Sequence, residues 1–78
     1  MNESTRILLE LMLKDARDII IFIRHVGTYD DFLVNVMAQK AIVLSLLNIG
    51  EQANRLPEEF TNQYHDIPWK QMVRMRHV

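Results

Sequence analysis

No proline occurs before Pro57, and the only glycines of the chain are Gly27 and Gly50. Folds rich in β-turns need many more of these residues, because glycine and proline supply the backbone angles of tight turns. With 78 residues, the chain is short enough to form one domain. We therefore expect an all-α protein with a few helices, two of them long.

The first helix is expected over residues 4–25, with Ser4 as its N-cap. Apolar residues recur there at steps of three and four, the spacing of one helix face. They are Leu9, Met12, Ala16, Ile19, Ile20 and Ile23. Other apolar residues widen this surface, so we expect the helix to pack on two sides or against a second protomer. Gly27 supplies the positive φ that ends it.

A second helical segment is expected from Thr28, a side chain suited to capping, as far as Leu56. Whether it is one long helix, or a short helix followed by a long one, the sequence leaves open. Gly50 interrupts the apolar pattern, and a glycine inside a helix indicates that another backbone passes close by. Glu51, beside it, is interpreted as an ordinary surface or ion-pair charge.

The C-terminal third is divided by its two prolines. Pro57 predicts a short helix near residues 58–63, and Pro68 suits the first position of a last helix over 69–78. Trp69 is interpreted as the packing anchor at the start of that helix. Together the segments predict an antiparallel bundle of four to five helices whose C-terminal helix is incomplete.

Several classes of protein are disfavoured by composition. The chain has no cysteine, which excludes disulfides and cysteine-based zinc sites. His25, His65 and His77 do not share the three- or four-residue spacing of a helical metal site. The longest apolar stretches, 19–23 and 41–47, fall far short of the ~20 residues that cross a bilayer. No signal peptide is recognised, so we expect a cytoplasmic protein.

Charge is distributed unevenly along the chain. Residues 1–63 carry six Lys/Arg against nine Asp/Glu, whereas residues 64–78 carry Lys70, Arg74 and Arg76 against Asp66 alone. The basic end is the place where a phosphate-bearing partner would bind, if there is one. A solvated helix face would give the same pattern.

Two strings are more specific than the periodicity. One is Ile-Gly-Glu-Gln-Ala-Asn-Arg-Leu at 49–56, and the other is Ile-Pro-Trp-Lys-Gln-Met at 67–72, followed by Met-Arg-His at 75–77. A Pro-Glu-Glu-Phe turn at 57–60 lies between them. In this order the strings resemble the HepT-like family of HEPN domains, and the resemblance covers nearly all of residues 1–78 as a single domain.

The resemblance implies a metal-independent endoribonuclease, the toxin of a toxin–antitoxin pair. Arg76 matches the arginine of the family's motif and His77 matches the polar residue after it, so both are candidate catalytic residues. The motif's catalytic histidine and tyrosine would follow Val78, and we expect this chain to be cut inside the motif and inactive alone. The implied chemistry is attack of the RNA 2′-hydroxyl on the adjacent phosphate, with no cofactor.

The resemblance also implies partners: a second copy in a homodimer, a nucleotidyltransferase-type (MNT) antitoxin and an RNA substrate. Two other interpretations remain open. A helical dimerisation or antitoxin-binding module without catalysis would explain the missing histidine, and a nucleotide-binding helical protein would explain the helical content alone. An Ile/Val-x-His-x-Tyr-like string soon after Val78 in the reading frame would favour the ribonuclease.

Overall fold

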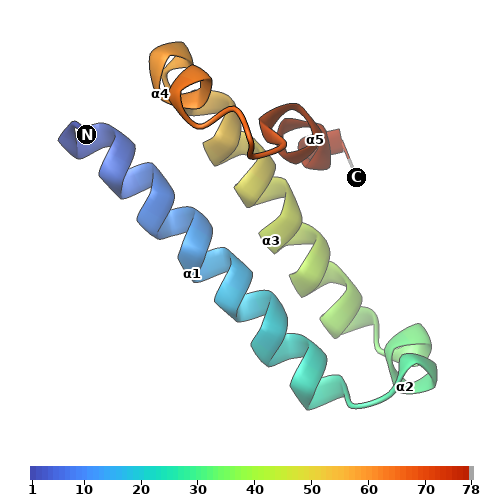
Figure 1. Ribbon diagram of the computed structural model, residues 1–78. Helices are drawn as coiled ribbons and strands as arrows, with labels where there is room; N and C mark the ends of the chain where they lie inside the picture. Colours follow the sequence, from blue (N-terminus) through green and yellow to red (C-terminus); the bar gives the residue numbers. More distant parts are fainter. Residues whose placement is uncertain (78) are drawn as a thin grey trace.

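Two long antiparallel helices form the frame of the molecule in the computed structural model, which describes residues 1–77. Helix α1 spans Glu3–Val26 and helix α3 spans Val36–Arg55, and they lie side by side (Figure 1). The short helix α2, Tyr29–Val34, connects them at one end. No strand occurs among the described residues, which confirms the all-α prediction.

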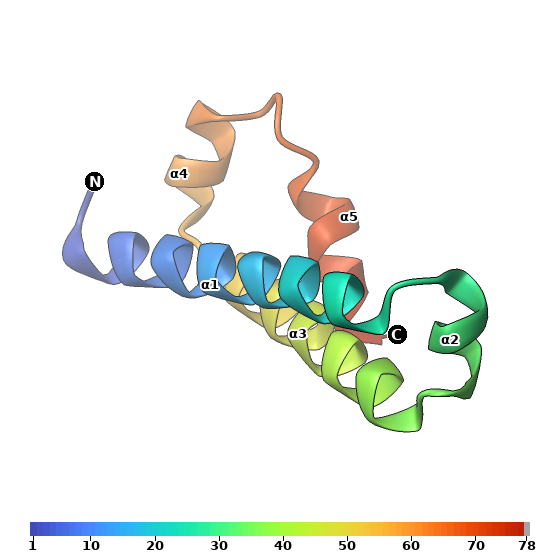
Figure 2. The ribbon, with the colours of Figure 1, turned by 90° about the horizontal axis from the view of Figure 1, so that it is seen from below.

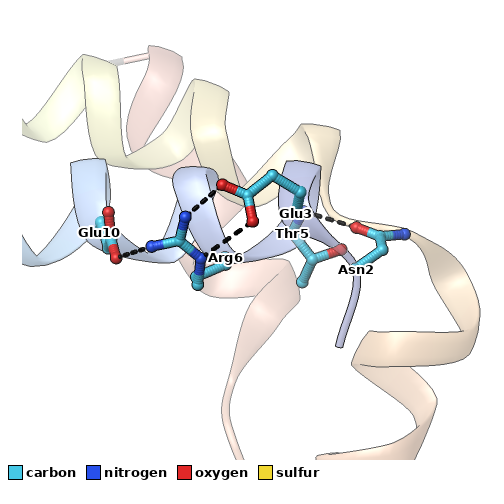
Figure 3. Close-up of polar contacts among 5 residues, drawn as sticks. All are labelled: Asn2, Glu3, Thr5, Arg6 and Glu10. Atoms are coloured by element: carbon cyan, nitrogen blue, oxygen red, sulfur yellow. Dashed lines mark hydrogen bonds and ion pairs between the residues drawn. The ribbon is translucent and has the colours of Figure 1, made fainter.

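The N-cap of helix α1 lies two residues earlier than expected. Asn2, not Ser4, is its N-cap: the Asn2 Oδ1 atom accepts a hydrogen bond of 2.8 Å from the Thr5 backbone N–H. The prediction for Ser4 was therefore wrong. Beside the cap, Arg6 pairs with Glu3 and Glu10 (Figure 3), and these ion pairs, that with Glu3 first, raise the pKa of the Arg6 guanidinium.

The connection between the long helices follows the sequence closely. Gly27 ends α1 with a φ of +88°, as predicted. Thr28 caps α2, because its Oγ1 atom accepts from the Asp31 N–H at 3.1 Å. The question left open by the sequence is resolved by Asn35, which ends α2 and caps α3 through a 2.9 Å bond from the Ala38 N–H.

Helix α4 spans Glu58–Gln63 and helix α5 spans Trp69–Arg74, and a 3₁₀ turn, η1, continues α5 over Met75–His77 (Figure 2). The expected last helix thus changes to 3₁₀ geometry after Arg74, and its final residue, Val78, lies outside the described residues. The α5–η1 segment packs on the C-terminal half of α3, and α4 lies between the end of α3 and α5 in the chain.

A small core holds these helices together. Met12 of α1 is buried against Ile49 and Ala53 of α3 and against Leu56, the residue that follows α3. Apolar side chains of α1, α4, α5 and η1 pack around them: Leu8, Leu9, Ala16, Ile19, Phe60, Trp69, Met72, Val73 and Met75.

Only part of the predicted apolar face of α1 packs against other residues of the described chain. Ile19 packs on the core, but Ile20 and Ile23 are about half exposed. None of the helices in the described part is long and apolar enough to cross a bilayer.

Gly50 has the close neighbour that the sequence predicts. It is buried, and a Cβ atom built on it would lie 2.6 Å from the backbone nitrogen of Arg76. The backbone of η1 therefore lies directly on α3 at this glycine. This contact fixes the level at which the C-terminal residues cross the long helix.

Candidate functional site

A groove of about 500 Å³ lies between the C-terminal end of α3, helix α4 and the α5–η1 segment. Its apolar lining comes from core residues: Ala53, Leu56, Trp69 and Val73. Its polar lining combines three cationic side chains with other polar groups: Lys70, Arg74, Arg76, His77, Asn54, Thr61 and Glu58. The two predicted site residues therefore lie together, in a groove formed by separate parts of the chain.

Contacts of Trp69 hold the start of α5 beside α4 at this groove. Trp69, at the first position of α5, contacts the Phe60 ring with centroids 6.0 Å apart, and its Nε1–H donates to the Tyr64 carbonyl at 3.0 Å. Phe60 and Tyr64 precede Trp69 by nine and five residues. Their contacts with Trp69 tie the start of α5 to α4 and to the turn after it. The predicted anchor role of Trp69 is confirmed.

Arg76 and His77 lie in the 3₁₀ turn and contact each other. Arg76 is half-buried, His77 is exposed, and the Arg76 Nε–H donates to His77 Nε2 at 3.4 Å. The remaining N–H groups of the guanidinium, its planar fork, are available to an anion.

The cations of the groove carry no protein counter-ion among residues 1–77. No carboxylate of these residues lies within 4.0 Å of Lys70, Arg74 or Arg76. Glu51, by contrast, pairs with Arg55 on the exposed side of α3 at 3.8 Å, the ordinary role expected of it. Unpaired cations around a groove with an apolar floor suit a phosphate-bearing ligand that also presents flat apolar surface.

Asn54 and Thr61 belong to the groove but were not singled out from the sequence. A signal for Asn54 existed: it follows Gly50 by four residues, so both lie on one face of the helix. Thr61 gave none, because its place depends on the direction that α4 takes after Pro57. The other histidines, His25 and His65, lie outside the groove and are exposed.

Comparison with known proteins identifies the family. The model of the HepT-like family, described as "Ribonuclease HepT-like", matches residues 12–78. The chain belongs to the HepT-like family. This confirms the resemblance inferred from the strings at 49–56 and 67–77, and with it the all-α HEPN-type bundle.

Curated relatives of this HepT-like chain carry ribonuclease names. A "Putative RNase" of Methanocaldococcus jannaschii is 42% identical over 75 residues, covering 96% of this chain and 61% of the relative. A "Probable ribonuclease HepT" of Thermococcus cleftensis is 38% identical over 48 residues, 62% of this chain and 44% of the relative. A "Putative RNase" of Caldanaerobacter subterraneus is 31% identical over 74 residues, 95% of this chain and 65% of the relative.

The chain thus spans about three fifths of the length of the M. jannaschii relative. No solved structure matches the HepT-like chain at the level of significance that these relatives reach. Arg76 and His77 both lie inside the matched range.

Proposed function

We propose that the protein is an endoribonuclease, with the groove between α3, α4 and α5–η1 as its RNA-binding site and residues 1–78 as one HepT-like domain. The observation that carries the proposal is the placement of Arg76: a half-buried arginine, without a carboxylate partner in the described chain, in a groove of a HepT-like fold. The relatives' ribonuclease names support it.

In the proposed reaction, the RNA 2′-oxygen attacks the adjacent phosphorus. A P–O2′ bond forms, the P–O5′ bond breaks, and the products end in a 2′,3′-cyclic phosphate and a 5′-hydroxyl. A general base takes the 2′-hydroxyl proton and an acid returns one to the leaving 5′-oxygen. The need for a 2′-hydroxyl restricts the substrate to RNA.

Arg76 binds the phosphate in this scheme. Its fork of N–H donors matches two phosphoryl oxygens and stabilises the charge that develops on them. His77, held against Arg76 Nε, orients the guanidinium and is the second candidate residue of the motif. Because His77 directly follows Arg76 and does not lie a helical turn away from it, we do not assign proton transfer to His77.

The biological setting belongs to the same proposal. We propose a cytoplasmic toxin that acts as a homodimer and is neutralised by an MNT-type antitoxin. The half-exposed apolar residues of α1 and α3, such as Ile20 and Leu44, support a surface that a second copy covers. A module that only dimerises or binds the antitoxin is the alternative, and it predicts no RNA cleavage.

An RNA-cleavage assay without divalent metal tests the proposal. The 78-residue chain, the complete reading frame and its Arg76→Ala variant are compared, with Arg17→Ala on the exposed side of α1 as a matched control. We expect the complete protein and the control to cut RNA, and Arg76→Ala to lose at least about 100-fold in rate, the cost of removing one charge-stabilising donor. Absence of cleavage by the complete protein would favour the binding module.

A further inference from the structure

Gly50 lies where the backbone of η1 crosses α3. A Cβ atom at this position would lie 2.6 Å from the Arg76 backbone nitrogen, 3.0 Å from the Met72 carbonyl oxygen and 3.2 Å from the Arg76 Cβ. The two shortest distances are to backbone atoms, so no change of side-chain rotamer relieves them. A methyl group would force η1 away from α3.

Nothing in the backbone of α3 itself requires glycine at this position. The only glycine with positive φ in the described chain is Gly27, so Gly50 has a conformation that any residue adopts. Alanine is the better helix former. The requirement for glycine therefore comes from the neighbour that crosses it, and that neighbour includes Arg76.

We propose that Gly50 is a positioning residue for Arg76: it sets the separation between α3 and η1 and thereby places the guanidinium in the groove. The inference rests on the ribonuclease function proposed above. Gly50 lies in α3, 26 positions before Arg76 in sequence. It would contribute to cleavage through its contact with the backbone that carries Arg76.

The test uses Gly50→Ala in the complete gene product. Lys14→Ala is the control, because Lys14 is an exposed residue of α1 that does not line the groove. Thermal melting followed by circular dichroism establishes that each variant is folded at the assay temperature.

We expect Gly50→Ala to lower kcat roughly 10- to 100-fold, because a misplacement of about 1 Å can cost a factor of that order. KM should change by less than about threefold, since Lys70, at the other end of α5, still binds the RNA backbone.

Two further measurements separate positioning from loss of structure. In the Arg76→Ala background, Gly50→Ala should lower single-turnover cleavage no further, because residues that act as a unit are not additive. The backbone amide resonances of Met72–His77 should shift in Gly50→Ala, while those of the first half of α1 should stay in place. The amide map does not depend on activity.

Each outcome has one meaning. A Gly50→Ala protein with wild-type kcat, or with unshifted amides at Met72–His77, overturns the proposal. A multiplied loss in the double variant also overturns it, by showing that Gly50 and Arg76 act independently. If the wild-type protein cuts no RNA, the ribonuclease function fails, and the amide map still decides whether Gly50 sets the place of η1.

Discussion

Trp69 joins the C-terminal segment to the core through two kinds of interaction. Its ring packs near Phe60, and its indole N–H donates to the Tyr64 carbonyl, which lies near solvent. Trp69→Phe keeps most of the packing and loses the bond, so it should cost about 0.5 kcal/mol in the free energy of unfolding. Trp69→Ala should cost about 3 kcal/mol, because a large ring is removed from a partly buried site. Urea unfolding of both variants measures the difference, and equal losses would show that the hydrogen bond dominates.

The N-terminus of α1 offers a second test at the level of single residues. The Asn2 Oδ1 atom accepts the Thr5 N–H, and Ser4 is exposed inside the first turn (Figure 3). Asn2→Ala should therefore destabilise the protein by about 1 kcal/mol, the typical value of a lost N-cap. Ser4→Ala, the matched control, should change stability by less than about 0.5 kcal/mol. A larger loss for Ser4→Ala in urea unfolding would place the cap where the sequence predicts it.

These two positions show why sequence reasoning succeeded at one and failed at the other. Trp69 follows Pro68, and that pair indicates both a helix start and an anchor. Asn2 and Ser4 are equally good capping residues, two positions apart, so no local rule chooses between them. The structure makes the choice: the N–H of the buried residue Thr5 donates to Asn2 Oδ1.

At the scale of elements, the existence of the helices was predictable and their breaks were less so. The break at Asn35 has no proline or glycine to signal it. It is stabilised by polar contacts: Asn35 caps α3, and Gln39 Nε2 donates to the carbonyls of Phe32 and Leu33 at the end of α2. The Gly50 contact was predicted as a close approach, but its partner was not, because no local pattern says which backbone crosses a helix.

Helix α5 contributes a cation that should bind RNA without reading its sequence. Lys70 lines the groove and has no carboxylate within 4.0 Å among residues 1–77. Lys70→Ala should weaken binding of 2′-O-methylated RNA, which cannot be cleaved, by a similar factor for different sequences. The slope of log affinity against log salt should fall by about one, as expected for one lost phosphate contact. Lys40→Ala, outside the groove, should leave both quantities unchanged in fluorescence anisotropy, and an unchanged slope in Lys70→Ala would contradict the assigned contact.

The whole molecule buries little of its apolar surface. Among residues 1–77, only four hydrophobic residues are buried. Many of the exposed ones lie toward the α2 end of both long helices: Ile20, Ile21 and Ile23 on α1, and Val36, Met37, Val43 and Leu44 on α3. Others, Ile7, Leu11 and Leu13, lie in the first half of α1. Composition indicated an excess of apolar residues on the first helix. It could not say which of them the bundle would cover, since that depends on where α4 and α5 pack. They pack at the opposite end, around Met12 and Ala53, which leaves the α2 end uncovered.

A protein with this surface should associate, and the association should depend on the uncovered residues. Ile20 is 50% exposed, so Ile20→Gln removes apolar surface with little effect on the internal core. Sedimentation or light scattering at several concentrations should show that Ile20→Gln weakens the dimer at least about tenfold. Arg17→Gln, an exposed change one turn earlier on α1, should leave the dimer intact.

If Ile20→Gln dimerises as the wild type does, the copies meet on another face. If the wild type is a monomer with a sharp thermal transition, the bundle is stable with this end exposed, and the homodimer is excluded from the proposed mechanism.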